Sequence, residues 1–261
     1  MTLAAKTVLI TGAAQGLGLT AAALLSQRNW RVILVDIQSL DAQVEQLRRQ
    51  GCEARGICGD ISSEEFVADL AATVRREHAA LDGLVNNAGV SLIVPAEQTS
   101  AAQWQRVMAI NLFGPFLLSR YLGAQMLDRG AGSIVNVASI AGLAGVSHRS
   151  AYNASKHGLI GLTQTLAAEW GGRGVRVNAV CPGWIKTEMD AADQGAGAYS
   201  DADIVERVPL ARFARAADVA EAIAFLLDAE RSGFINGVSL PVDGGWIADA
   251  SWNSLRLRTR A

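Results

Sequence analysis

Three side chains have the types and spacing of a proton-transfer site. Tyr152 and Lys156 lie four residues apart, and Ser139 precedes Tyr152 by thirteen residues. On a helix, positions i and i+4 lie on one face, one turn apart. A Tyr with an ordinary pKa near ~10 ionises little at neutral pH, but a neighbouring cation favours the phenolate. We therefore expect Lys156 to lower the pKa of Tyr152, which suits proton exchange with an alcohol or a carbonyl oxygen.

The same residues also have a purely structural interpretation. A Tyr and a Lys at this spacing can be an aromatic side chain that packs at the surface beside a solvated ammonium. Ser139, placed after an apolar run, can cap a helix or a turn. The choice between chemistry and packing therefore depends on what the rest of the chain places around these residues.

A glycine-rich turn follows the first expected strand and opens a helix. Glycine allows positive φ and a close approach of the backbone to a pyrophosphate, and a helix N-terminus presents free N–H groups to phosphates. Asp36 ends the second expected strand, where a carboxylate accepts hydrogen bonds from the adenosine ribose and repels a 2′-phosphate. We therefore predict NAD as the cofactor, rather than NADP. The residues assigned to the turn are Gly12, Gln15, Gly16, Leu17 and Gly18.

Short apolar runs alternate with longer helical patterns. The expected strands cover residues 7–10, 31–35, 53–57, 83–85, 133–137, 175–180 and 239–242. They largely lack polar alternation, as strands of a parallel sheet buried on both faces do. The expected helices cover residues 16–28, 39–50, 63–78, 100–128, 150–170 and 216–228. This order predicts an α/β fold: a Rossmann-like doubly wound parallel sheet of about seven strands with helices on both faces.

Residues 1–261 are predicted to form a single domain, with three local departures from the regular order. Pro115 falls inside a long helical pattern and predicts a kink there. The Gly/Ala/Asp-rich stretch 184–212 is predicted to be a loop that serves as a substrate lid. The tail 247–261 carries Trp252, Leu255 and Leu257 among arginines. It is either a frayed, solvated end or a segment that packs on a neighbouring subunit and helps to close a site.

Charge and composition exclude several kinds of partner. The formal charge of −2 and the pI near 5.9 give no electrostatic reason to expect nucleic acid or an anionic membrane. We see neither a membrane span of ~18 uncharged apolar residues nor a signal-peptide pattern, so we expect a cytoplasmic protein. Three cysteines without a CxxC spacing fit free thiols in a reducing compartment. The three histidines have no ligand spacing, so we expect no metal.

With the glycine turn, the Ser–Tyr–Lys set and their order, the chain resembles the short-chain dehydrogenase/reductase family in its small single-domain form. The resemblance covers residues 6–246, nearly the whole chain. The matching motifs, in chain order, are the turn 11–18, Asp60, the segment Asn86-Asn87-Ala88-Gly89, Asn111, Ser139, Tyr152-x-x-x-Lys156, Pro182-Gly183 and Asp243-Gly244-Gly245-Trp246.

The resemblance implies a role for each matching position. Tyr152 is expected to be the general acid/base. Lys156 is expected to hold the nicotinamide ribose, and Ser139 to bind the substrate oxygen. Asn111 is expected to sit at a break in its helix and hold a water that relays protons to Lys156. The other implied cofactor contacts are Asp60 and Ile61 at the adenine, Asn87, Ala88 and Gly89 beneath the adenosine, and Pro182, Gly183, Ile185 and Thr187 near the nicotinamide.

These expectations define an NAD-dependent oxidoreductase that transfers a hydride between a secondary alcohol, of polyol, sugar or hydroxy-acid type, and its ketone. The enzymatic alternative is a 3-oxoacyl reductase acting on an acyl-carrier-protein or CoA thioester. A non-enzymatic alternative is a nucleotide-sensing regulator, but such a protein is expected to have lost Tyr152 or Lys156. A third alternative is a sugar-nucleotide epimerase or dehydratase from the extended branch of the same superfamily. That branch is expected to need a larger C-terminal substrate domain, whereas this chain has room only for the lid 184–212.

Substrate recognition and assembly are less well defined by the sequence. Substrate contacts are expected from residues 140–149, from 184–212 and from the segment around Leu92 to Pro95. These segments are mostly small or apolar, with His148 and Arg149 as polar exceptions. We expect His148 and Trp184 to contact the substrate beside Ser139 and Tyr152, although His148 can also be a solvent-facing loop residue. The resemblance implies a homotetramer, or a homodimer, built through helices 100–128 and 150–170 and the last strand.

Overall fold

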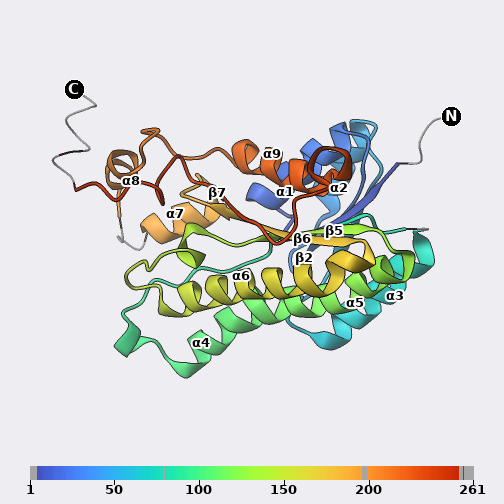
Figure 1. The fold of residues 1–261 in the computed structure, drawn as a ribbon, viewed down its shortest axis with the longest axis horizontal. Helices are drawn as coiled ribbons and strands as arrows, with labels where there is room; N and C mark the ends of the chain where they lie inside the picture. Colours follow the sequence, from blue (N-terminus) through green and yellow to red (C-terminus); the bar gives the residue numbers. More distant parts are fainter. Residues whose placement is uncertain (1–4, 79, 196–198, 253–254, 256–261) are drawn as a thin grey trace.

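The computed structural model describes residues 5–78, 80–195, 199–252 and 255. At its centre is one sheet of seven parallel strands in the order β3-β2-β1-β4-β5-β6-β7 (Figure 1). The order reverses between β1 and β4, where the carboxyl ends of the strands diverge and leave a crevice. The predicted Rossmann-like doubly wound sheet is therefore confirmed. The strands are β1 (Thr7–Thr11), β2 (Arg31–Asp36), β3 (Ala54–Cys58), β4 (Gly83–Asn86), β5 (Gly132–Val137), β6 (Val175–Pro182) and β7 (Ser239–Val242).

Helices cover both faces of the sheet (Figure 1). One face carries α1 (Gly16–Gln27), α2 (Asp41–Arg49) and α9 (Ala216–Leu227). The other carries α3 (Glu64–Glu77), α4 (Ala101–Met108), α5 (Gly114–Arg129) and α6 (Ser150–Trp170). Alternate residues of β1 enter different cores, because Val8 and Ile10 pack with the first group of helices and Leu9 with the second. Both faces are thus buried, which explains the unbroken apolar runs of the strands.

The long helix expected over 100–128 is interrupted by a π-helical turn at Ala109–Phe113. This turn separates α4 from α5, and Asn111 lies within it, fully buried. The helix break expected at Asn111 is therefore confirmed. Pro115 lies just after it, in the first turn of α5, so the kink that we expected at Pro115 falls at the preceding π turn.

The stretch 184–212 is not the loop that we predicted, since it contains two helices, α7 (Glu188–Gly195) and α8 (Asp201–Arg207). A capping box starts α8, in which Ser200 and Asp203 satisfy each other's backbone N–H groups. The alanines and acids of the stretch are compatible with short helices once a cap fixes their start. The remaining short elements are α10 (Ala229–Ser232) and 3₁₀ turns at Ala96–Gln98, Ile140–Gly142 and Gly171–Arg173.

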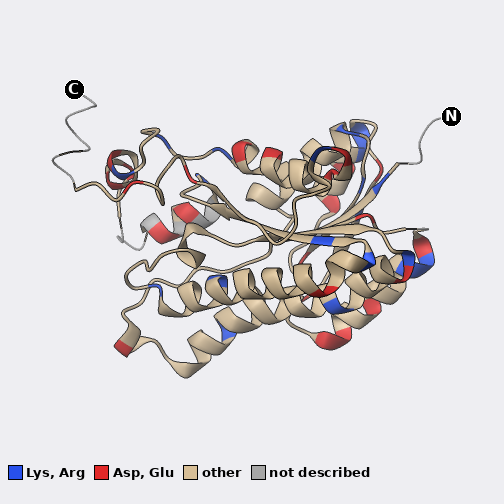
Figure 2. Ribbon diagram, viewed as in Figure 1, with Lys and Arg blue, Asp and Glu red and all other residues tan. Residues whose placement is uncertain are grey.

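One helical stretch of the described chain, Ala101–Arg129, is long and apolar enough to span a membrane by length and composition alone. Half of its most apolar window is buried inside the protein, as is usual for a core helix. Acidic and basic residues alternate along the ribbon in Figure 2, and some of them form ion pairs, such as Arg75–Asp128 and Arg120–Glu64. In the tail, Trp252 is 71% exposed, and Leu257 lies outside the described residues.

Candidate active site

The carboxyl ends of the strands surround a cavity of about 600 Å³. It runs from the glycine turn after β1 to the start of α6 and to α7. Most of the site residues predicted from the sequence line it. These are Gly12, Gln15, Gly16, Leu17, Asp36, Asp60, Ile61, Asn87, Ala88, Gly89, Ser139, Tyr152, Lys156, Pro182, Gly183, Trp184, Ile185 and Thr187. Gly18, Asn111 and His148 lie outside this lining.

The glycine turn is closed against the segment that follows β4. Gly12 and Gly16 have φ of 65° and 57°, in the left-handed region that favours glycine. A Cβ on Gly18 would overlap the carbonyl oxygen of Gly12. The amide of Asn87 donates hydrogen bonds to the carbonyl oxygens of Thr11 and Gly12, at 2.9 and 3.0 Å. Gly18 therefore serves the packing of the turn, and Asn87 holds its shape.

The N-terminus of α1 faces this cavity without a side-chain cap on its first-turn N–H groups. At the end of β2, the two oxygens of Asp36 accept hydrogen bonds from the backbone N–H groups of Ala14 and Gln38, both at 3.0 Å. A helix dipole and free N–H groups favour a phosphate at the turn, while a carboxylate at the end of β2 favours ribose hydroxyls. These features fit a dinucleotide.

The far wall of the nucleotide end comes from the segments after β3 and β4. Asp60 accepts hydrogen bonds from the backbone and the hydroxyl of Ser62, at 2.9 and 2.8 Å. Ile61 is buried, and a Cβ on Gly114 would stand only 2.9 Å from its Cδ1. The small residue at the start of α5 thus leaves room for Ile61, which presents an apolar surface to the cavity.

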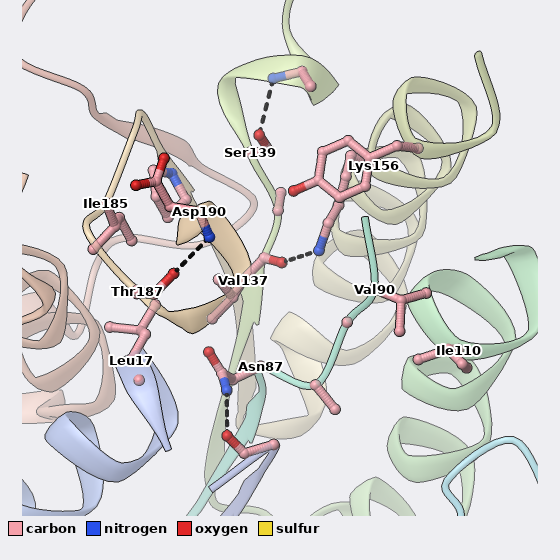
Figure 3. A pocket seen from close by; sticks show the side chains of 18 of the residues that line it. Leu17, Asn87, Val90, Ile110, Val137, Ser139, Lys156, Ile185, Thr187 and Asp190 are labelled. Atoms are coloured by element: carbon pink, nitrogen blue, oxygen red, sulfur yellow. Dashed lines mark hydrogen bonds between the residues drawn. The ribbon is translucent and has the colours of Figure 1, made fainter. Parts of the chain in front are cut away.

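Ser139, Tyr152 and Lys156 converge at the other end. The Ser139 hydroxyl accepts a hydrogen bond from the backbone N–H of Ala141 at 3.1 Å, and it lies close enough to Tyr152 to lower the pKa of that phenol. The Lys156 ammonium lies 5.7 Å from the centroid of the Tyr152 ring and donates to the carbonyl oxygen of Val137 at 2.7 Å, as Figure 3 shows for Lys156 and Val137. The three side chains predicted to act together are therefore neighbours.

The pKa of Tyr152 departs from our expectation. Burial raises it above its ordinary value, because desolvation penalises the phenolate. The hydrogen bond from Ser139 and the charge of Arg149 oppose this effect. The guanidinium carbon of Arg149 lies 5.7 Å from the centroid of the Tyr152 ring. The lowered pKa that we expected for Tyr152 is therefore not found in the structure, because burial outweighs the groups that favour the phenolate.

The ammonium of Lys156 is itself perturbed. Lys156 is 4% exposed, and this burial lowers its pKa to about 8, because a charged group loses its hydration. Burial also raises the pKa of the nearby Cys181 thiol to about 11. At neutral pH the site therefore holds a neutral thiol and an ammonium that gives up its proton more readily than an exposed lysine does.

Asn111 supports the site from behind. Its amide exchanges two hydrogen bonds with the backbone of Val90, at 2.8 and 3.0 Å, and donates a third to the Ser155 hydroxyl at 3.2 Å. A Cβ on Gly89 would stand 3.3 Å from the Asn111 oxygen and 3.6 Å from the Lys156 nitrogen. The π turn thus brings Asn111 close to the ammonium, and Gly89 leaves the space between them open.

The structure does not bring His148 to the cavity. Its side chain is exposed, its φ is 60°, and its carbonyl oxygen accepts a hydrogen bond from Val94. The next residue, Arg149, lines the cavity instead. Trp184 does line it, with its ring 5.5 Å from that of Trp246 and 6.5 Å from that of Tyr199. A substrate contact through His148 therefore has no support in this structure.

Sequence reasoning missed the polar side chains that 184–212 contributes. Asp190, Asp193 and Tyr199 line the cavity, and the Tyr199 hydroxyl donates to Asp190 at 2.8 Å. Figure 3 shows Asp190 and Thr187 across the cavity from Lys156. The acids that follow Thr187 have the spacing of a helix, and this spacing could have indicated that they share a face. We predicted a loop for this stretch instead. The substrate end is therefore more polar than we predicted.

Comparison with known proteins identifies the family. Residues 12–247 match the family model described as enoyl-(acyl carrier protein) reductase. This match covers most of the chain. It agrees with the parallel sheet, the glycine turn and the Ser–Tyr–Lys cluster. The chain belongs to the short-chain dehydrogenase/reductase family.

Similar proteins within this family act on different substrates. The chain is 38% identical to D-threitol dehydrogenase of Mycolicibacterium smegmatis, over 92% of each chain. It is 34% identical to a 3-oxoacyl-[acyl-carrier-protein] reductase of Synechocystis, over 94% of this chain and 98% of that one. A crystal structure of a putative NAD(P)-dependent gluconate 5-dehydrogenase from Beutenbergia cavernae, with bound NADP, superposes with a TM-score of 0.89 at 34% identity, covering 95% of this chain and 98% of that one.

Proposed function

We propose that this protein is an NAD(H)-dependent dehydrogenase that interconverts a secondary alcohol, of polyol, sugar or hydroxy-acid type, and its ketone. The observation that carries the proposal is the cluster of Ser139, Tyr152 and Lys156, in which the buried ammonium of Lys156 lies 5.7 Å from the centroid of the Tyr152 ring. This cluster lies in the same cavity as the uncapped N-terminus of α1 and the Asp36 carboxylate. Proton-transfer groups and a dinucleotide cradle in one cavity are what hydride transfer at a C–OH centre requires.

In this mechanism Tyr152 accepts the proton of the substrate hydroxyl during oxidation and returns it during reduction. Ser139 donates a hydrogen bond to the substrate oxygen and stabilises charge that develops there. The bound nicotinamide would supply hydride acceptance and donation at carbon. Lys156, whose ammonium is already fixed by Val137, would hold the ribose and pass protons toward Asn111. Because the two titrating groups are coupled, a measured pKa belongs to the Tyr152–Lys156 pair.

The preference for NAD rests on Asp36. Its carboxylate stands at the end of β2, anchored by two backbone N–H groups, and a 2′-phosphate there would meet a fixed negative charge. The similar gluconate 5-dehydrogenase structure holds NADP at low occupancy, so membership of the family does not decide the cofactor, and the proposal rests on Asp36 of this chain. The remaining nucleotide contacts would come from the predicted residues that line the cavity.

A 3-oxoacyl reductase remains the second candidate, since one relative bears that name at 34% identity. Against it, the substrate end is lined by the acids Asp190 and Asp193 and by the aromatic rings of Trp184 and Tyr199, which suit a small polar substrate better than an acyl chain. The nucleotide-sensing regulator is disfavoured because Tyr152, Lys156 and Ser139 are all present and in contact. We further propose a cytoplasmic homotetramer that uses α4, α5, α6 and β7 as interfaces.

The test is a measurement of NADH absorbance with NAD⁺ and a panel of polyols, sugars, hydroxy acids and steroid alcohols. A parallel series with NADP⁺ and with NADPH plus a 3-oxoacyl thioester covers the alternative. We expect turnover of secondary alcohols with NAD⁺. Reduction of the thioester without oxidation of any alcohol would favour the second candidate, and binding of NADH with no turnover in either series would favour the regulator.

A further inference from the structure

Arg149 and Asp193 form an ion pair that links helix α7 to the start of α6, the helix that carries Tyr152 and Lys156. The guanidinium of Arg149 donates to Asp193 at 2.9 Å and to the Ser91 hydroxyl at 2.8 Å. The Ser91 hydroxyl in turn donates to the same oxygen of Asp193 at 3.0 Å. The two charged side chains are 12% and 15% exposed. Three segments that are distant in sequence thus meet in one shielded polar contact, where Coulomb attraction is stronger than at the surface.

This pair lies at the substrate end of the cavity. Both residues line it, and the Arg149 guanidinium also sits over the Tyr152 ring. A substrate whose reacting oxygen lies between Ser139 and Tyr152 would therefore extend toward Arg149 and Asp193. The substrate groups beyond the reacting carbon must therefore be compatible with the charges of Arg149 and Asp193.

The charges of the described lining residues leave little attraction for an anion. Three cations line the cavity: Arg106, which is exposed on α4, Lys156, which is bound to Val137, and Arg149. Arg149 is already neutralised by Asp193. Asp190, 6% exposed, adds a second carboxylate that accepts a hydrogen bond from Tyr199 and pairs with Lys186. An anionic substrate group beside Arg149 would therefore meet the carboxylates of Asp193 and Asp190 without an unpaired cation of its own.

We propose that the Arg149–Asp193 pair selects uncharged polyhydroxy alcohols and excludes hydroxy acids, phosphorylated sugars and other anions. This inference rests on the proposed dehydrogenase function and narrows its substrate class. A hydroxyl group both donates and accepts, so it fits beside an intact ion pair, with the carboxylates as acceptors and the guanidinium as donor. A substrate carboxylate would instead stand close to the shielded carboxylate of Asp193, and the repulsion of like charges in such a site is costly. Specificity then arises from a repulsive element as well as from attractive contacts.

The decisive experiment compares alditols with the aldonates of the same carbon number and configuration, by kcat/KM with NAD⁺. For the unmodified enzyme we expect a preference for the alditol of at least about tenfold, equivalent to about 1.4 kcal/mol. Asp193→Asn removes the competing charge and frees Arg149, so the ratio should shift toward the aldonate by about tenfold or more. Asp193→Asn combined with Arg149→Gln should lose that gain. Glu221→Gln, which removes a surface carboxylate paired with Arg28, should leave the ratio unchanged.

Each outcome bears on the proposal. Preference of the unmodified enzyme for an aldonate, or turnover of other secondary alcohols but of no alditol, would overturn it. So would an unchanged ratio in a folded Asp193→Asn variant, judged by NADH binding and by the melting temperature. If that variant does not fold, the ratio for the unmodified enzyme decides. Absence of turnover with every alcohol would instead defeat the dehydrogenase function itself, so the two failures are distinguishable.

Discussion

The carboxylate of Asp36 accepts a hydrogen bond from the backbone N–H of Ala14 at 3.0 Å, across 22 residues of sequence. The contact joins the end of β2 to the glycine turn after β1. It therefore fixes both the position of the negative charge and the shape of the turn that would carry the pyrophosphate. Because one side chain does both, the charge and the anchor have to be separated in any test of cofactor choice.

Two substitutions separate the effect of the negative charge from that of the anchor to Ala14: Asp36→Ala and Asp36→Asn. Both remove the charge that would repel a 2′-phosphate, but only Asn retains an oxygen that can accept from Ala14. We expect the ratio of kcat/KM for NADP⁺ to that for NAD⁺ to rise about tenfold or more in both variants. The Ala variant should in addition bind both cofactors more weakly. Asp128→Asn, at a surface pair with Arg75, is the control, and an unchanged ratio in both Asp36 variants would argue against NAD selection by this residue.

Gly18→Ala should damage the nucleotide turn without touching the catalytic groups. The new methyl group would overlap the Gly12 carbonyl oxygen and approach Asn87 Nδ2 to 2.6 Å. Such overpacking costs about 1–3 kcal/mol, so we expect a lower melting temperature and weaker NADH binding by fluorescence titration. Gly172→Ala meets nothing within 4 Å and should match the unmodified protein. Normal NADH affinity in Gly18→Ala would show that the turn does not bind the cofactor.

Ser139→Ala should change both the rate and its pH dependence. The hydrogen bond from Ser139 lowers the pKa of Tyr152 against the effect of burial, so its loss raises that pKa. Alcohol oxidation needs the phenolate, and the rising limb of kcat/KM against pH should therefore move to higher pH. The lost donor to the developing alkoxide should also lower kcat by about 10²-fold. A slower enzyme with an unmoved limb would mean that Ser139 does not tune Tyr152.

Tyr152→Phe removes the proposed acid/base and keeps the ring under Arg149. Acid–base catalysis is worth about 10²–10⁴-fold, so turnover should fall by at least that factor at every pH. NADH binding should persist, because the phenol is not part of the glycine turn. Retention of more than a tenth of the activity would refute the acid/base role of Tyr152. Tyr121→Phe is the matched control, because it removes an exposed hydroxyl that donates to Glu64. It should leave turnover unchanged.

The cysteines should differ sharply in reactivity. Cys181 is fully buried, and burial raises its thiol pKa to about 11, whereas Cys58 is exposed and Cys52 is half-buried. Thiolates are the reactive form, so a thiol reagent at pH 8 should modify two of the three cysteines in the native protein and all three after unfolding. Cys181→Ala should leave the native count unchanged. Rapid native modification of three thiols would contradict the burial of Cys181.

The fold followed from the sequence because its determinants are local and repeated. Apolar runs mark strands that are buried on both faces, and each is separated from the next by a helical pattern. The residues after the strands then meet at one edge of the sheet, as for the glycine turn, Asp36, Ser139 and Pro182. Errors arose where a weak local signal depends on its partners. The helices α7 and α8 are examples, and so is the kink expected at Pro115, which lies instead at the π turn before it.

The order and spacing of the glycine turn, Ser139, Tyr152 and Lys156 determined the family, the sheet and the residues that would carry the reaction. Only the tertiary structure decided their electrostatics and the substrate end of the cavity. Burial sets the direction of the Tyr152 pKa, and the hydrogen bond from Ser139 and the charge of Arg149 oppose it. Desolvation and ion pairing depend on which distant segments pack around a group. No pattern of spacing in the sequence predicts that Ser91, Arg149 and Asp193 meet beside Tyr152.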